Sequence, residues 1–335
     1  MAATPMHDAW TIVSRRLCSA VVLCVVLPGC GGSGTEPSPP ATSGSSGPAL
    51  SRLELFPNRF VALIGEALPF RVIARDTAGA EVSNVVPTYS SSNTAVVRVD
   101  PGGNVVANSA GMATVRATAG GQTAESVIHV GTNTYDSAQG PPRVLNASYI
   151  ELSKVERVSR FRSTVGHAYV DGSGETCRSM KHYFQPRQSI DWTSVEIYAP
   201  ASGTIWLIAT DGAAGFRVML RPRDFPALEV ALFHVNLDPA VVRNTWVEAG
   251  DRIGRHASPF TMSDIATGVG GKEGTLFSYF ETMTDAVFSQ FQSRGVTSRQ
   301  AAIITRAERD QDQVPCVGEQ QFTVQGRTPD WVVLN

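Results

Sequence analysis

Residues 89–118 read YSSSNTAVVRVDPGGNVVANSAGMATVRAT, and this stretch decides the fold of the first folded domain. Short runs such as AVVRVD and GMATVRAT alternate apolar with polar residues, so every second side chain lies on one face of an extended strand. The turn DPGGNVV separates two such runs, and its glycines supply the backbone conformations that turns need. No helical period is visible from Ser51 to Val130. The pattern predicts a small β-sandwich.

The same segment resembles the bacterial Ig-like domain of group 2. The resemblance is carried by residues 61–82, VALIGEALPFRVIARDTAGAEV, and by residues 89–118, with SSSN, the Val-Asp turn, Gly103 and the SAG before the last strands. It implies an Ig-like domain over residues 50–131 that serves as an adhesion or spacer module. A single copy favours a spacer, because adhesins more usually carry tandem copies. An adhesin whose specificity lies in its loops remains an alternative.

The N-terminus predicts export. Arg15 and Arg16 precede an apolar run from Leu17 to Leu27. As a helix this run spans about 16 Å, too short for a bilayer core of about 30 Å, and the pattern is typical of a secretory signal. The sequence LPGC, ending at Cys30, resembles the bacterial lipobox, whose cysteine is lipidated. We therefore expect residues 1–30 to be a lipoprotein signal; a signal without lipidation and a short hydrophobic anchor are the alternatives.

A flexible linker is expected over residues 31–49. The stretch GGSGTEPSPPATSGSSGP buries almost nothing and cannot offset the entropy of ordering. No aspartate follows Cys30, which by resemblance to lipoproteins implies a lipid anchor in the outer membrane of the cell envelope. The formal net charge is −2 and no basic block occurs, so a nucleic-acid partner is not expected.

The chain has five cysteines, which the export signal divides into two groups. Cys18, Cys24 and Cys30 fall in the signal, so Cys177 and Cys316 remain in an oxidising compartment where a disulfide persists. A bridge between them would close a long loop and stabilise the fold by about 4 kcal/mol or more in the chain-entropy description. The alternative is two thiols that serve a metal, but neither cysteine has a Cys or His at zinc-finger spacing.

A second domain is expected over residues 145–335, after a linker at 132–144. Strand-like runs such as GTIWLIAT, FRVMLRP and LEVALFHV come first. Helices are predicted from Asp285 to Ser293 and from Thr297, where Gln300 completes a capping-box pattern. Strands followed by helices predict an antiparallel β domain with C-terminal helices, and so a chain that is mainly β.

This second domain resembles the M23 peptidases of the lysostaphin and LytM type. Residues 194–205, SVEIYAPASGTI, and 247–257, VEAGDRIGRHA, are strand–glycine-turn–strand signatures of that family. The resemblance implies a zinc cofactor and peptidoglycan as substrate. In GHAYVD, His167 and Asp171 match the family's first two zinc ligands. In FHVNL, His234 matches a catalytic histidine.

The match fails at the family's His-x-His strand. By this alignment Phe277 takes the place of a catalytic histidine and Tyr279 that of the third zinc ligand, in the segment FSYFE. His182, in CRSMKHYF, is a candidate replacement ligand beside His167 and Asp171, since imidazole and carboxylate suit zinc. The alternative, which we favour, is a packed or surface histidine next to its aromatic neighbour.

Two functions follow from these patterns. The first is a non-catalytic envelope lipoprotein that binds peptidoglycan or an envelope protein. The second is a zinc metallopeptidase acting on peptidoglycan, with a site rebuilt around His182. The sequence has no Gly-x-Ser-x-Gly elbow, phosphate loop or dinucleotide fingerprint, so it offers no support for other enzyme classes.

Overall fold

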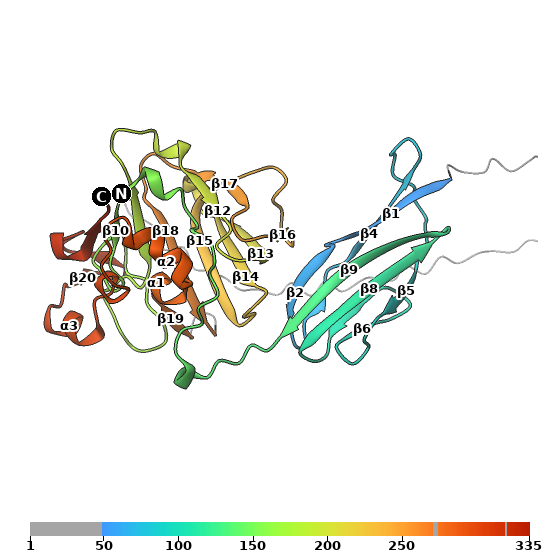
Figure 1. Cartoon of the computed structure of the whole chain (residues 1–335), viewed down its shortest axis with the longest axis horizontal. Coiled ribbons are helices and arrows are strands. Elements are labelled where there is room, and N and C mark those ends of the chain that lie inside the picture. Colours follow the sequence, from blue (N-terminus) through green and yellow to red (C-terminus); the bar gives the residue numbers. More distant parts are fainter. Residues whose placement is uncertain (1–48, 271–273, 319) are drawn as a thin grey trace, which may run out of the picture. The chain divides into compact units, whose positions relative to one another are not determined.

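The computed structural model describes residues 49–270, 274–318 and 320–335. The predicted signal with Cys30 lies outside the described residues, and so does all but the last residue of the predicted linker. Strands dominate the described ranges, and the few helices come near the C-terminus (Figure 1). The mainly β prediction is confirmed. Within these ranges no helix combines the length and the apolar character needed to cross a membrane.

The first domain consists of short strands in small sheets. One sheet has the order β2-β9-β8-β5, in which β2 and β9 are parallel, and a second has the order β3-β7-β6; β1 pairs with β4. The strands are β1 Leu50–Phe56, β2 Arg59–Leu63, β3 Ala67–Leu68, β4 Arg71–Asp76, β5 Thr88–Ser91, β6 Val97–Val99, β7 Val105–Ala107, β8 Gly111–Ala119 and β9 Gln122–Gly131. The alternation read from the sequence is present: Ala113, Val115 and Ala117 of β8 are buried while their neighbours are not.

The second domain is built on one large antiparallel sheet. Its main path is β16-β13-β14-β15-β18-β11-β10-β22; β12 pairs with β17, β17 also pairs with β15, and β19 pairs with β18. The strands are β10 Val155–Ser159, β11 His182–Pro186, β12 Glu196–Tyr198, β13 Gly203–Thr210, β14 Phe216–Pro222, β15 Leu228–Leu237, β16 Trp246–Val247, β17 Arg252–His256, β18 Ser263–Val269, β19 Thr275–Phe277 and β22 Trp331–Val333. A separate hairpin joins β20 Cys316–Val317 to β21 Gln321–Phe322.

Two glycines explain the strand–turn–strand signatures of this domain. A Cβ atom on Gly203 would lie 2.1 Å from the carbonyl oxygen of Arg221, and one on Gly254 would lie 2.2 Å from that of Asn236. Real side chains do not approach backbone so closely. The motifs SGTI and RIGRH therefore need glycine because the sheet folds tightly on itself at these points.

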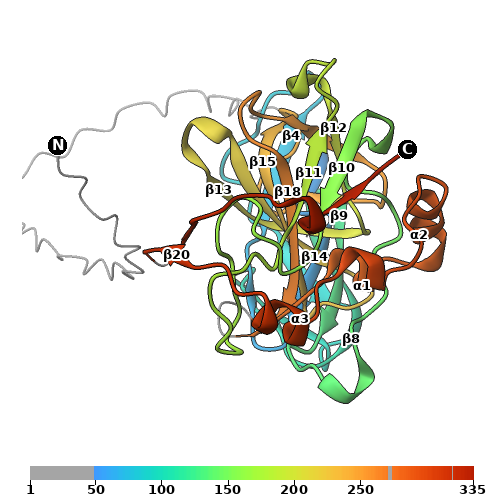
Figure 2. The same cartoon turned by 90° about the vertical axis from the view of Figure 1, so that its left-hand side faces the viewer.

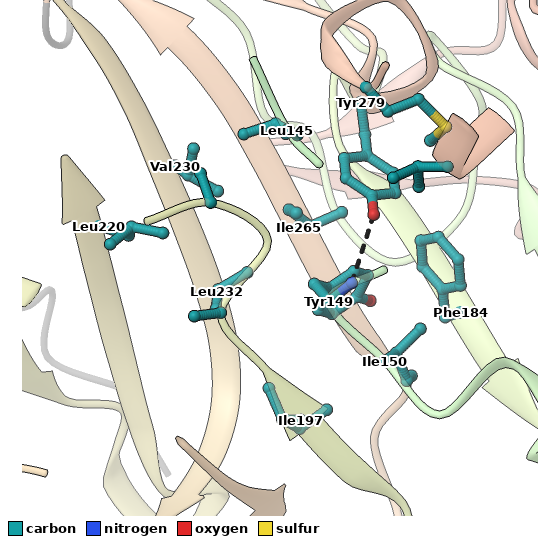
Figure 3. Packing of buried hydrophobic residues seen from close by; sticks show 14 of the residues in the cluster. Leu145, Tyr149, Ile150, Phe184, Ile197, Leu220, Val230, Leu232, Ile265 and Tyr279 are labelled. Atoms are coloured by element: carbon teal, nitrogen blue, oxygen red, sulfur yellow. Dashed lines mark hydrogen bonds between the residues drawn. The ribbon is translucent and has the colours of Figure 1, made fainter. Parts of the chain in front are cut away.

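One face of the large sheet carries the apolar core. Leu232 and Ile265 contribute from β15 and β18, and Tyr149 and Phe184 pack edge to face beside them. Tyr279 points into the same core, where its hydroxyl accepts a hydrogen bond of 3.3 Å from the backbone N–H of Tyr149 (Figure 3). The residue aligned with the third zinc ligand is thus a fully buried core residue, and that alignment is wrong.

The segment SYFE is a helix start and not a strand. β19 ends at Phe277, and α1 spans Tyr279–Thr282 with Ser278 as its N-cap. The Ser278 hydroxyl and the Glu281 carboxylate form a capping box, in which Glu281 accepts the backbone N–H of Ser278 at 3.1 Å. Because Ser-x-x-Glu satisfies the free N–H groups of a helix start, the chain leaves the sheet here. Phe277 packs against Tyr135 rather than facing a metal site.

The C-terminal helices agree with the sequence in part. α2, Asp285–Gln292, lies where a helix was predicted. The helix predicted from Thr297 is wrong: residues Gln300–Ala302 form only a short 3-10 turn, and α3 spans Arg306–Gln311. Here the capping box that operates is Thr305 with Glu308, a stronger start than Thr297 with Gln300 because both of its reciprocal hydrogen bonds form. The three helices gather beside the large sheet (Figure 2).

Candidate functional site: a buried chain of charges

The site lies on the face of the large sheet opposite the apolar core. β15 and β18 are antiparallel neighbours, with Phe233 opposite Asp264. Side chains alternate between faces along a strand, so Asp264 and Ala266 point away from the core that Ile265 enters. Ala231, Phe233 and Ala266 form a separate small cluster on this face, covered in part by Tyr169. The site is therefore a mixed patch of apolar and charged groups beside the centre of the sheet.

A bulge in β15 turns His234 toward this face. Val218 pairs with Leu232 and Phe216 with Val235, so two residues of β15 oppose one of β14. His234 has φ of +58°, a left-handed conformation that is uncommon for a residue other than glycine. The bulge lets both Phe233 and His234 approach the site from one strand. Bulges of this kind are frequent next to functional sites, where they redirect a side chain.

Four titratable side chains, Asp211, His234, Asp264 and Lys181, form a continuous chain of contacts at the site. The Asp211 carboxylate lies 3.0 Å from His234 Nδ1, and the Asp264 carboxylate lies 3.1 Å from His234 Nε2. The other oxygen of Asp264 accepts a hydrogen bond of 2.8 Å from Lys181 Nζ. The Asp211 side chain is 36% exposed and that of His234 is 19% exposed, whereas Asp264 and Lys181 are buried, at 0% and 2% exposure. Only the Asp211 end is open to solvent.

The pKa shifts of His234 and Asp264 follow from their burial and from the charged groups beside them. Burial lowers the pKa of His234, but the carboxylates of Asp264 and Asp211 outweigh burial and raise it overall. Burial opposes ionisation of Asp264, but Lys181 and His234 outweigh burial and lower its pKa. The contacts of His234 are close ion contacts without ideal hydrogen-bond angles, since neither His234 Nδ1 nor Asp264 Oδ1 has a well-aligned partner among the described residues. When His234 is protonated, its charge and that of Lys181 balance the two carboxylates.

Lys181 is held by aromatic rings as well as by charge. Its Nζ lies 3.7 Å from the ring centroid of Phe233 and 4.6 Å from that of Tyr169. The electron-rich faces of the rings attract the ammonium group, most strongly where water is excluded. Its Nζ also lies 3.3 Å from His167 Nε2. The ammonium therefore joins the charge chain to the first of the predicted ligands.

His167 is neutral and directs its lone pair at Lys181. Its Nδ1 lies 2.9 Å from the carbonyl oxygen of Ala168. An ammonium group can only donate, so Nε2 must accept and Nδ1 must carry the hydrogen that Ala168 receives. Burial lowers the pKa of His167, and the charge of Lys181 lowers it further. The histidine thus serves as a hydrogen-bond acceptor for a lysine.

Asp171 anchors the backbone. One carboxylate oxygen accepts the N–H of Ser173 at 2.9 Å, and the other accepts the N–H of Leu276 in β19 at 2.9 Å. Burial would raise the pKa of Asp171, but the hydrogen bonds from Leu276 and Ser173 outweigh it and lower the pKa. Asp171 therefore ties the segment before β11 to the end of the sheet.

His182 is a core residue and does not complete a metal site. It is 1% exposed; Nδ1 lies 2.7 Å from the carbonyl oxygen of Ser159 and Nε2 lies 2.8 Å from the Ser278 hydroxyl. Its ring stacks on Phe161, and burial lowers its pKa to about 4. Both ring nitrogens are engaged, so His182 as a zinc ligand is wrong, and the packed-histidine alternative describes its place.

The residues present do not fit the zinc site that the resemblance implies. His167, Asp171 and His182 do not converge, and the described part of the chain contains no group of three His, Cys, Asp or Glu side chains placed to hold a metal ion. His234 is connected to His167 indirectly: His234 contacts Asp264, Asp264 contacts Lys181, and Lys181 contacts His167. The sequence interpretation missed Lys181 as a site residue; it weighed Asp264 only as a carboxylate pair with Glu281 for glycan hydrolysis and set that pair aside. A lone carboxylate in the otherwise uncharged strand SDIATGV was the available signal.

The predicted disulfide is present. Cys177 and Cys316 are bonded, with Cα atoms 5.5 Å apart and a sequence separation of 139. The bond joins the segment before β11 to β20. The same segment is held by Glu175, which forms ion pairs of 2.8 Å with Arg162 and 2.6 Å with Arg178. The segment before β11 is thus fixed covalently and by charge.

Comparison with known proteins identifies the first domain. Residues 53–129 match the family described as bacterial Ig-like domain (group 2), inside the predicted range of 50–131. No curated protein matches the chain.

Solved structures similar to the chain include the following three. Helicobacter pylori Csd3 has 10% identity and a TM-score of 0.32, over 65% of this chain and 49% of that chain. A zinc-containing peptidase from Vibrio cholerae has 9% identity and a TM-score of 0.31, over 62% and 76%. An M23 peptidase-like protein from Pseudomonas aeruginosa has 13% identity and a TM-score of 0.23, over 59% and 88%.

The chain thus matches about half the length of Csd3. At identities and TM-scores this low, the likeness carries no argument about activity. The chain therefore carries a group 2 bacterial Ig-like domain over residues 53–129 and has M23 peptidase-like proteins among its structural neighbours.

Proposed function

We propose that the chain is a lipid-anchored protein of the bacterial cell envelope, with the Ig-like domain as spacer and the second domain as a module that binds peptidoglycan without cleaving it. The anchor rests on the lipobox resemblance at Cys30. The spacer rests on a single Ig-like copy at residues 53–129. The binding role rests on the resemblance of the second domain to enzymes whose substrate is the wall.

One observation carries the non-catalytic part of this proposal: the predicted ligands are each engaged elsewhere. His182 is sealed in the core, Asp171 binds backbone N–H groups, and His167 faces an ammonium group. A catalytic zinc needs three protein ligands and an open position for the water that it activates. The donor set of this domain does not provide that arrangement.

Peptidoglycan binding and cleavage can be measured in one experiment. The full-length chain, purified in mild detergent, is incubated with zinc and cross-linked sacculi, which are then sedimented. We expect the protein in the pellet and no soluble muropeptides in the supernatant. Release of muropeptides that His167→Ala abolishes would establish the rebuilt peptidase instead. Protein that stays in the supernatant would refute wall binding and favour a protein partner.

A further inference from the structure

We infer that Lys181 is a resident cation: its ammonium group takes the place of a metal ion between His167 and Asp264. Two contacts define that place, 2.8 Å from Nζ to an Asp264 carboxylate oxygen and 3.3 Å from Nζ to His167 Nε2. An imidazole nitrogen and a carboxylate oxygen are both common metal donors. Here they converge on a positive charge that the chain itself supplies.

The burial of this ion pair makes a cation necessary. Asp264 is 0% exposed and Lys181 is 2% exposed. A buried carboxylate without a counter-charge is strongly destabilising, whereas a paired one is tolerated. His234 partly neutralises the other oxygen of Asp264 from 3.1 Å, and Asp211 in turn faces His234. Removing Lys181 would therefore leave an excess negative charge inside the domain.

The register of β11 selects lysine for this place and excludes His182. Successive residues of a strand point to opposite faces, and a shift of one residue exchanges them. Tyr183 faces the site, where its hydroxyl accepts the N–H of His167 at 3.4 Å. His182 lies on the other face, against Ser278 and Phe280. Lys181 lies on the same face as Tyr183. The β11–β18 pairing that buries His182 in the core therefore also places the Lys181 ammonium group beside Asp264.

Lys181 and a metal ion would compete for the same two donor atoms, His167 Nε2 and one carboxylate oxygen of Asp264. The lone pair of His167 Nε2 accepts from Lys181, and the Asp264 oxygen that Lys181 contacts is the one not facing His234. Zinc–nitrogen and zinc–oxygen bonds are about 2.0–2.2 Å long, so a metal could not reach either donor while the ammonium remains. The unchanged protein should therefore be indifferent to zinc and to chelators.

The test uses the full-length chain and follows its melting temperature with and without zinc or EDTA. We expect neither to change the melting temperature of the unchanged protein. Lys181→Met should lower it by roughly 10 °C, since it strands Asp264 in the interior. Lys154→Ala is the matched control, because Lys154 is also paired with a carboxylate but is 31% exposed. It should have an effect of only about 1 or 2 °C.

Cavity variants report on the cation directly. In Lys181→Ala the lost side chain leaves room for a small ammonium, so propylammonium should restore part of the melting temperature while propanol should not. Asp264→Asn in the Lys181→Met background should be more stable than Lys181→Met alone, because neither buried charge then remains. This comparison of the double variant with Lys181→Met tests the role of the Lys181 charge even if Lys181→Ala does not fold.

Three results would overturn the inference. The first is stoichiometric zinc binding by the wild-type protein that is lost in His167→Ala. The second is a melting temperature of Lys181→Met equal to that of Lys154→Ala. The third is a Lys181→Met/Asp264→Asn double variant that is no more stable than Lys181→Met. None of these readouts involves peptidoglycan, so the inference stands or falls separately from wall binding.

Discussion

Replacing His182 with glutamine is expected to change the pH dependence of folding more than the stability at neutral pH. The imidazole makes hydrogen bonds of 2.7 Å to the Ser159 carbonyl and 2.8 Å to the Ser278 hydroxyl in the core. Glutamine can replace at least one of them, so at pH 7 the variant should lose only about 1 kcal/mol. Unlike histidine, glutamine takes up no proton in acid.

The sign follows from the depressed pKa. Burial lowers the pKa of folded His182 to about 4, whereas an unfolded histidine titrates near 6.5. Between these values the unfolded chain binds the proton and the folded chain does not. The resulting penalty is nearly absent above pH 6.5 and grows as the pH falls toward 4. At pH 5 it amounts to about 2 kcal/mol, which the glutamine variant does not suffer.

Urea unfolding of both proteins at pH 7 and pH 5 measures this difference. The stability of the unchanged protein should fall by about 2 kcal/mol more than that of His182→Gln, with equal m-values. Other histidines are common to both proteins and cancel in the comparison. Equal losses in the two proteins would show that His182 is not a buried neutral group. A zinc-dependent stabilisation absent from the variant would return His182 to the role of ligand.

Three further predictions concern the anchor, the disulfide and a second buried ion pair. Cys30→Ser should move the protein from the membrane to the soluble fraction on cell fractionation; continued membrane association would reject lipidation. Cys316→Ser should lower the free energy of unfolding by about 4 to 5 kcal/mol in urea, because the bond closes a long loop; a protein equally stable under reducing conditions would contradict this. Arg309→Met should cost about 3–5 kcal/mol, because Asp330, 2.6 Å from Arg309, is 1% exposed, whereas the same change at Arg306, 56% exposed, should have little effect.

Sequence patterns within a single strand or helix predicted those parts of the fold that depend mainly on interactions between residues close in sequence. Alternation along β8 marks its buried face, and the helix predicted from Asp285 to Ser293 corresponds to α2. The disulfide was predicted by counting the cysteines that remain after the predicted export signal. SYFE was misassigned because a family alignment was given precedence over Ser-x-x-Glu, the ordinary signature of a helix start.

The geometry of the site depends on how strands pair, which the sequence of one strand does not show. Whether Lys181 or His182 faces Asp264 is set by the pairing of β11 with β18, where a shift of one residue exchanges the two faces. The bulge at His234 depends on the pairing of β15 with β14. Neither pairing can be read from the residues of one strand, so the sequence named candidate residues without their partners.

The retained family residues have structural reasons to persist, and this bears on the choice between the two functions. His167, Asp171 and His234 match active-site positions in the resemblance to M23 peptidases, and this match favours the peptidase alternative. Yet His167 accepts a hydrogen bond from a buried ammonium, and Asp171 satisfies the backbone N–H of Leu276. His234 lies between two carboxylates, one of them fully buried. Loss of any of the three would remove a hydrogen-bond or charge partner from a group inside the fold, so their presence does not require catalysis.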